Sequence, residues 1–419
     1  MPAVPESGVL RFGDRGPAVR ALQRALARLR FEPGKADGVF ATQTRAAVVA
    51  FQQANGLAPD GIVGPQTARA LNDPGAKAAQ PGLPTPGVTD PPDAAAARSG
   101  LAAAVASGRL SRREAARYDA ILDRFLVRLS EGSGERAVTL AAVLHDVSLH
   151  SAVYDRPRAL ALFEMLDTNA RYFAQRDPPS KMTDIAGSDG AIHRFIPGHG
   201  FQVHPLANFA RLNALVAAGE RERAVRLARA AVARAVRANG AFTWEYYFPF
   251  KGPSRWTSGM AQAVAAQALA RTAALVDDGE LAEAARGAYA AIPGKLVRPL
   301  AGGLWLREYG FSDIAILNSQ LQAVLSIGDY AELADDTEAR GVAEQLAAAT
   351  RALLPRFDTG CWSLYSLGGS EASLSYQLYV VFMLRKLAAK RREPIWGEMA
   401  RRWNPSRRAR AGGTGCAAA

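Results

Sequence analysis

Three helical hairpins of similar length follow one another in the second half of the chain, and this repeat is the feature that most constrains the fold. In each hairpin apolar residues recur at i, i+3 and i+4 on both helices. The hairpins read LNALVAAGERERAVRLARAAVARAV, LARTAALVDDGELAEAARGAYAAI and LQAVLSIGDYAELADDTEARGVAEQLAAATRALL. One such hairpin cannot bury both of its faces, so successive hairpins must stack into a solenoid or close into a ring. The sequence therefore predicts an all-α fold with a helical-hairpin (α/α) toroid or barrel.

A short strip rich in glycine and aromatic residues follows each hairpin, with tryptophans at 244, 305 and 362 that lie 61 and 57 residues apart. Loops leaving the same end of each hairpin converge on one mouth in a curved array. We expect these strip residues around one cavity: Trp244, Tyr246, Tyr247, Trp305, Glu308, Tyr309, Trp362 and Tyr365. Aromatic rings stack on pyranose faces and polar groups bond the hydroxyls, so a sugar-polymer site is predicted. For the tryptophans, a core role inside the barrel is the alternative.

The first unit, residues 10–73, is a separate small module. Asp-Gly recurs at 37–38 and 60–61, each time before an apolar pair and a Gln-Thr, and three short helices joined by glycine turns are expected. Residues 74–97 contain six prolines and are expected to form an extended, semi-rigid linker. Residues 98–400 form the helical unit, and residues 401–419, which carry several arginines, form an expected disordered tail.

The strings LRFGDRGPAVRALQRAL and DGVFATQTRAAVVAFQQANGLAPDGIVGPQTARAL resemble the peptidoglycan-binding domain type 1 family. The resemblance covers essentially all of the first unit. It implies a three-helix module that often accompanies cell-wall enzymes, and hence peptidoglycan as a partner and a cell-envelope or extracellular location. The start MPAVPESGVL has no basic segment followed by an apolar core, so no signal peptide is predicted, and a cytoplasmic location stays open.

Four strings in the second unit, together covering about 242–388, resemble the C-terminal domain of D-glucuronyl C5-epimerases. They are PSRWTSGMAQA, REYGFSDIAILNSQLQAVLSIGDY, LLPRFDTGCWSLYSL and SYQLYVVFML, in the order in which that family has them. The resemblance implies epimerisation of glucuronate in a uronic-acid polysaccharide. Such a reaction removes the proton alpha to the carboxylate and returns one to the opposite face, which needs two acid/base groups and no metal or redox cofactor.

The resemblance also implies roles for particular residues. It makes Glu308 and Tyr376 the acid/base pair, with Tyr309 and Tyr365 orienting the uronate. Where the family pattern continues with an arginine after the tyrosine matched by Tyr365, this chain has Ser366 and Leu367, and Arg307 is the candidate replacement. The further substrate-binding candidates are Trp305, Trp244, Tyr246, Tyr247, Arg307, Asn318, Gln202 and His204.

The composition narrows the alternatives. A net charge of +12 suits an acidic polymer, yet no basic run is interleaved with aromatics, so nucleic acid is not expected. No apolar stretch approaches the ~20 residues of a membrane helix, and the five histidines show no metal-ligand spacing, so neither a membrane span nor a metal site is predicted. A uronate polysaccharide lyase, which begins with the same proton abstraction, and a non-catalytic glycan- or cell-wall-binding protein remain alternatives.

Overall fold

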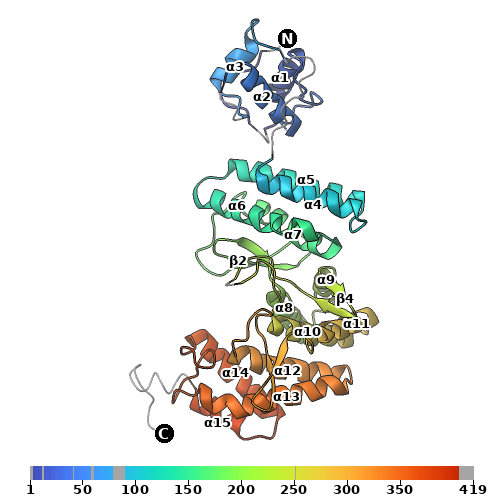
Figure 1. The fold of residues 1–419 in the computed structure, drawn as a ribbon, viewed down its shortest axis with the longest axis vertical. Coiled ribbons are helices and arrows are strands. Elements are labelled where there is room, and N and C mark those ends of the chain that lie inside the picture. The colour runs from blue at the N-terminus through green and yellow to red at the C-terminus, as the bar shows by residue number, and fades with distance from the viewer. Residues whose placement is uncertain are drawn as a thin grey trace.

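A computed structural model of the chain describes residues 3–11, 14–40, 42–57, 61–78, 90–250 and 252–404. Within these ranges the fold is built from fifteen α-helices and small antiparallel sheets, which confirms the predicted predominance of helices. Successive segments form layers along the long axis of the molecule (Figure 1). No helix among the described residues is long and apolar enough to cross a membrane.

The N-terminal module consists of α1 (Pro17–Arg28), α2 (Thr42–Ala54) and α3 (Pro65–Asn72) around its own apolar core. The same hydrogen bond, from a glycine amide to a glutamine side chain, occurs in both copies of its internal repeat. The carboxamide oxygen of Gln23 accepts a hydrogen bond from the Gly38 amide at 2.8 Å, and that of Gln52 accepts one from the Gly61 amide at 2.9 Å. Both glycines have positive φ, which an Asp-Gly turn needs. The buried carboxamides therefore anchor both turns to the helices.

A second layer contains four helices and a three-stranded antiparallel sheet of order β1-β2-β3. Its elements are α4 (Pro92–Ala106), α5 (Arg112–Glu131), α6 (Gly134–Ser148), a 3-10 turn (Ser151–Val153), α7 (Arg156–Tyr172), β1 (Asp184–Ala186), β2 (Ile192–Ile196) and β3 (Gly200–Val203). Helix α4 begins at Pro92, inside the range expected as linker, because proline suits the first turn of a helix and an alanine run follows it. Residues 79–89 of the expected linker lie outside the described residues.

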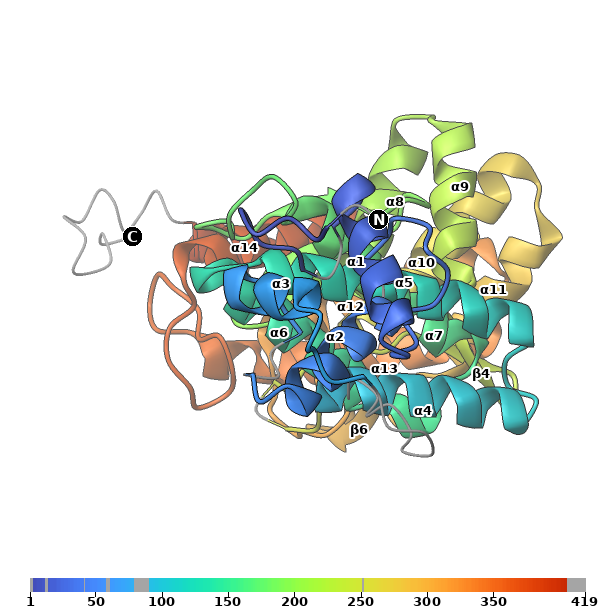
Figure 2. The ribbon, with the colours of Figure 1, turned by 90° about the horizontal axis from the view of Figure 1, so that it is seen from above.

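Four helical hairpins follow in the described part of residues 205–404. They are α8 (Pro205–Ala217) with α9 (Arg221–Val232), α10 (Gly259–Val276) with α11 (Gly279–Ala290), α12 (Leu317–Leu333) with α13 (Thr337–Leu353), and α14 (Leu374–Lys390) with α15 (Ile395–Arg402). The first helix of each hairpin packs against the first helix of the next, so α8, α10, α12 and α14 form an inner row in chain order. Helices α9 and α11 lie on the opposite side of the molecule from α14 (Figures 1 and 2).

The fourth hairpin extends into the range that was expected to be a disordered tail. Helix α15 runs to Arg402, and Trp403 is fully buried with its indole nitrogen donating to Asp358 at 2.7 Å. Arg402 pairs with the same carboxylate at 2.7 Å. The segment expected to be a disordered tail therefore starts as packed structure, while residues 405–419 lie outside the described residues.

The strips that follow the hairpins contain two β-hairpins, β4 (Val236–Ala238) with β5 (Ala241–Thr243) and β6 (Val297–Leu300) with β7 (Gly303–Leu306), and a 3-10 turn (Leu354–Phe357) precedes the third strip. Each strip is fixed by a buried glutamine on the inner helix that follows it. Gln262, Gln320 and Gln377 accept the backbone N–H of Trp244, Leu306 and Ser363, respectively, at 2.7–3.1 Å. These glutamines are 58 and 57 residues apart, so the hydrogen bonds that hold the strips recur with the same period as the hairpins.

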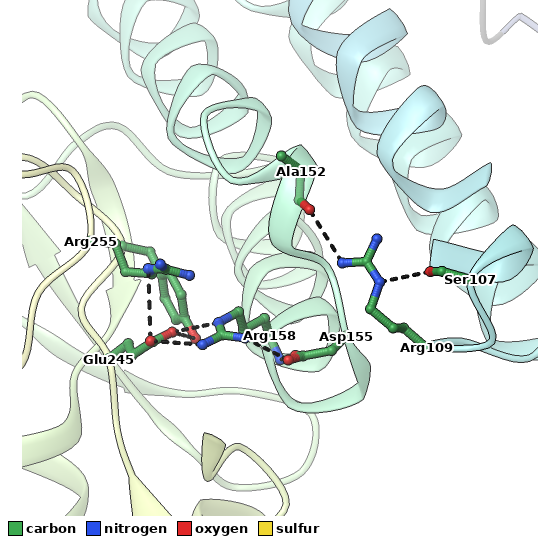
Figure 3. Close-up of polar contacts among 8 residues, drawn as sticks. Ser107, Arg109, Ala152, Asp155, Arg158, Glu245 and Arg255 are labelled. Carbon is green, nitrogen blue, oxygen red and sulfur yellow. Dashed lines mark hydrogen bonds and ion pairs between the residues drawn. The ribbon is translucent and has the colours of Figure 1, made fainter. Parts of the chain in front are cut away.

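An ion-pair network joins the second layer to the first strip (Figure 3). The guanidinium of Arg158 on α7 donates to both carboxylate oxygens of Glu245, at 2.8 and 3.0 Å, and to Asp155 at 2.6 Å. Arg255 lies 3.8 Å from the same glutamate. Both Arg158 and Glu245 are mostly buried, so this bidentate pair fixes the first strip against α7.

Candidate active site

The inner row of helices lines a cavity of about 790 Å³. Its walls come from α8, α10, α12 and α14, and one side is completed by the strip that follows β7. Of the residues singled out from the sequence, Glu308, Tyr309, Asn318, Tyr365 and Tyr376 all line this cavity. Segments far apart in the sequence therefore bring one carboxyl group, one carboxamide and three phenols to the same space.

Glu308 is held in place by the segment that opens α10. The Gly259 amide donates to the Glu308 carbonyl at 3.0 Å, and the Gly310 amide donates to the Thr257 carbonyl at 2.9 Å. A side-chain carbon at Gly259 would lie 2.3 Å from the Arg307 backbone oxygen, so only glycine permits this approach. Ser258 caps α10 by accepting from the Ala261 amide at 3.0 Å. Two of the strings that carried the family resemblance are thus paired at the cavity.

The Glu308 carboxyl group is buried, and no basic side chain among the described residues forms an ion pair with it. Burial raises its pKa to about 7, and the Ser319 and Ser258 hydroxyls and the Met260 amide offset only part of that rise. Ser258 Oγ donates to Glu308 Oε1 at 2.9 Å, whereas Oε2 is buried without a hydrogen-bond partner in the described chain. The Ser319 hydroxyl lowers the pKa of Glu308, although its position does not meet the geometry of a hydrogen bond. A carboxyl group with a pKa near neutrality can exchange a proton at physiological pH.

Four tyrosines line the same cavity as this carboxyl group. Burial and the charge of Glu308 raise the pKa of Tyr309 to about 12, which the Tyr365 hydroxyl partly offsets. Tyr365 and Tyr376 lie with ring centroids 4.9 Å apart. Tyr379, which the family resemblance did not single out, has a pKa raised to about 12 by burial and donates to Gln322 at 2.5 Å. Phenols with raised pKa values stay protonated at neutral pH, so their hydroxyl groups can donate hydrogen bonds to a ligand.

The cations of the cavity lie elsewhere than the sequence suggested. Arg307 does not line the cavity, because its guanidinium pairs with Asp313 at 2.7 Å and bonds the Lys295 carbonyl at 3.1 Å. Arg194 on β2 does line it, fixed by a bidentate pair with Asp184 at 2.7 Å. Residues 98–200 show no family pattern, and no signal in the sequence distinguishes Arg194 from the other arginines there. The fold alone places this cation at the site.

The three strip tryptophans lie in the interior rather than along the cavity. Trp305 is fully buried and stacks on Phe357, with centroids 5.7 Å apart. Trp244 and Trp362 donate their indole N–H groups to the Ala231 and Ala372 carbonyls, each at 2.7 Å. All three are buried, and Trp244 and Trp305 belong to the main apolar core, where their large apolar surface is removed from water. The core alternative thus describes where the tryptophans lie.

The remaining candidates, apart from Asn318, do not line the cavity. Tyr246 stacks on Trp256 at 4.1 Å and Tyr247 lies in the core of the second layer. Gln202 donates to Asp146 at 3.0 Å, and His204 caps α8 by accepting from the Ala207 amide at 3.1 Å. Burial lowers the pKa of His204 to about 3, so it stays neutral.

Asn318 differs from these residues because it lines the cavity with an unsatisfied acceptor. Its side-chain oxygen is buried and has no partner among the described residues. Such an oxygen is available to a ligand hydroxyl. Within the same ranges, no three His, Cys, Asp or Glu side chains are grouped so that they could hold a metal ion.

The structure joins a small three-helix module to a larger helical region that lines the cavity, and each of the two parts matches a known family. Residues 15–71 match the family described as a putative peptidoglycan binding domain, and residues 237–405 match the D-glucuronyl C5-epimerase C-terminus. Both resemblances found in the sequence are confirmed. The chain therefore contains a peptidoglycan-binding module and a C5-epimerase-like C-terminal region. Arg194 and α8 lie before the second match, so part of the cavity wall comes from outside it.

Curated relatives match over short stretches. The chain is 43% identical over 75 residues to the N-acetylmuramoyl-L-alanine amidase CwlL of Bacillus licheniformis, which is 17% of this chain and 21% of that protein. It is 48% identical over 66 residues to a zinc D-Ala-D-Ala carboxypeptidase of Streptomyces albus G, 15% of this chain and 25% of that enzyme. The chain thus spans a quarter or less of each of these two relatives.

Proposed function

We propose that this protein epimerises C5 of glucuronate residues in an acidic polysaccharide of the cell envelope. The observation that carries the proposal is the Glu308 carboxyl group, whose pKa is raised to about 7 in a cavity where no cation contacts it. Phenols surround this group and Arg194 lines the same space. The match of residues 237–405 to the C5-epimerase family supports the same assignment.

In the proposed reaction, ionised Glu308 takes the proton from C5, and the electron pair of the C–H bond delocalises into the adjacent carboxylate. A protonated tyrosine, Tyr376, returns a proton to C5 from the opposite face, and Tyr309 and Tyr365 orient the sugar. Arg194 balances the charge of the carboxylate while the intermediate exists. Proton transfer from the glutamic acid back to the phenolate, through solvent, restores both groups. Asn318 accepts a sugar hydroxyl at its unpaired oxygen.

The shape of the helical region suits a long substrate. The inner helices contact one another in the order α8, α10, α12, α14. We infer that they form an α/α toroid with an open side, through which a polymer can enter the cavity without a chain end. The N-terminal module would hold the protein at peptidoglycan, where acidic envelope polymers are close by. This supports a cell-envelope location.

The reaction is tested by incubating the full-length protein with glucuronate-containing polymers, among them heparosan, in deuterated water. Deuterium gained at C5 with the chain intact, seen by NMR, is the expected result. An unsaturated uronate at a new chain end would instead identify a lyase, and binding without exchange would identify a non-catalytic glycan-binding protein. Sedimentation with insoluble peptidoglycan tests the module separately.

A further inference from the structure

The cavity extends well beyond the group of residues around Glu308. Helix α14 contributes Tyr376, Tyr379, Phe382, Lys386 and Lys390 to its lining, in that order along the helix. Fourteen residues of helix correspond to about 21 Å, at 1.5 Å per residue. That distance is several times the width of one sugar ring, so the cavity is a groove rather than a pocket for a single residue.

The groove continues at the C-terminal end of α14. A second hollow of about 340 Å³ lies there and shares Leu325, Asp329 and Lys390 with the main cavity. The two spaces therefore adjoin through these three residues. The other charged side chains of the second hollow are of both signs: Glu332, Glu344, Glu393, Arg391 and Arg392.

The middle of the groove presents an exposed aromatic surface. Phe382 is 50% exposed, although it sits on a helix whose opposite face is buried. Its ring lies parallel to that of Tyr379, with centroids 6.5 Å apart and planes at 16°. Exposed, parallel rings along a groove offer stacking surface for the apolar faces of sugars. Among the described residues, the ring contacts of Phe382 are with Tyr379 and Lys386 on its own helix.

Three basic side chains gather at the far end of the groove: Arg271, Lys386 and Lys390. The carboxylate of Asp329 is buried and holds both Arg271 and Lys390, and Gln267 donates to it at 2.7 Å. Lys390 also lies 3.7 Å from Glu332, so these two carboxylates balance Arg271 and Lys390. Lys386, one turn before Lys390, lies 4.8 Å over the Phe382 ring and has no ion pair within the described chain. Its charge is free for a ligand.

We propose that this end of the groove, formed by Lys386, Lys390 and Arg271, is a distal subsite for the carboxylate of a second, non-reacting acidic sugar in the polymer bound at Glu308. The inference rests on the proposed function only in taking an acidic glycan as the ligand, and it does not depend on turnover. It implies that the protein prefers oligosaccharides long enough to reach from Tyr376 to Lys390. It also implies that their charge matters at a position remote from the reacting carbon.

The test is the affinity of the full-length protein for size-defined heparosan oligosaccharides, from disaccharide upward, measured by calorimetry. Neutral chitin oligosaccharides of matching length are the ligand control. The affinity is expected to rise in a step once the acidic oligosaccharide spans the groove, and to lack that step with the neutral series. Lys386→Ala is expected to reduce the step by about fivefold, as for one exposed charge pair.

Lys295→Ala is the matched variant, because Lys295 is exposed, lies outside the groove and carries the same charge. It is expected to retain the step. Equal affinities for short and long acidic oligosaccharides, or equal losses in both variants, would overturn the subsite. A length-dependent step in affinity without C5 exchange would support the subsite and contradict the proposed reaction. C5 exchange without such a step would support the reaction and contradict the subsite.

Discussion

Glu245 and Glu308 occupy comparable strips that follow successive hairpins, yet their surroundings differ. Glu245 receives two hydrogen bonds from Arg158 and one, at 3.3 Å, from the Tyr247 hydroxyl, with Arg255 nearby. Glu308 receives one from Ser258 and none from a cation. The fold thus produces one carboxylate that is fixed in an ion-pair network and one carboxyl group with a pKa near neutrality. The presence of a cation, and not burial, distinguishes the two.

The largest effect should follow Glu308→Gln. This change keeps the acceptor for Ser258 but removes the base, so C5 exchange should fall by about 10²–10⁴-fold. The measurement is deuterium incorporation into the polymer by NMR. Glu245→Gln is the control at the comparable position and should retain exchange. If Glu245→Gln abolished exchange and Glu308→Gln did not, the assignment of the two carboxyl groups would be reversed.

The pH dependence of stability should separate the wild type from Glu308→Gln. The pKa of Glu308 is about 7 in the folded protein against a usual 4.5, so the folded state keeps this proton longer than the unfolded chain. Stability is therefore lost as pH rises from 4.5 to 7, by at most roughly 3 kcal/mol. Denaturant unfolding at pH 5 and pH 8 should show that the free energy of unfolding of Glu308→Gln, relative to that of the wild type, is larger at pH 8 than at pH 5. Parallel curves for both proteins would argue against the raised pKa.

Glu245→Gln should lower the free energy of unfolding instead. It removes a charge from a mostly buried pair and leaves Arg158 only with Asp155, at a cost of about 2 kcal/mol. The loss should be visible in urea unfolding at neutral pH. A variant as stable as the wild type would show that the network in Figure 3 contributes little to holding the strip.

The smallest effects concern the two serines near Glu308. Both hydroxyls lower the pKa of Glu308, so Ser258→Ala and Ser319→Ala should each raise that pKa. In both variants, the pH at which activity appears should therefore be higher than in the wild type. Only Ser258→Ala also removes the cap of α10, which should reduce stability by about 1 kcal/mol. Activity–pH profiles and melting curves of the pair test this. An unchanged activity–pH profile in both variants would show that these hydroxyls do not influence the pKa of Glu308.

Much of the helical architecture follows from local pattern. The period of apolar residues predicted the three hairpins, and the tryptophan spacing predicted that they repeat. The position of each tryptophan relative to the cavity did not follow, because a strip residue can face either the helices or the open space, and only packing decides. The glutamines at 262, 320 and 377 do carry a sequence signal, since they recur at nearly the same period in the first turns of α10, α12 and α14.

The site was predictable in part. Glu308 and the tyrosines were identified by family resemblance, and the structure places them in one cavity. Arg194 was not predicted, because its placement depends on how β2 packs over a cavity built by residues far along the chain. The distal lysines on α14 were also missed, since a basic residue near a helix end usually has a capping or solvent-exposed role.

The central claim is that Glu308 exchanges a proton near neutral pH, and the most direct measurement is its own titration. Infrared difference spectra of the carboxyl stretch, wild type minus Glu308→Gln, give the midpoint without a substrate. We predict a midpoint close to 7, from the burial of the group without a cation. A midpoint near 4.5, as for an exposed glutamate, would contradict the account.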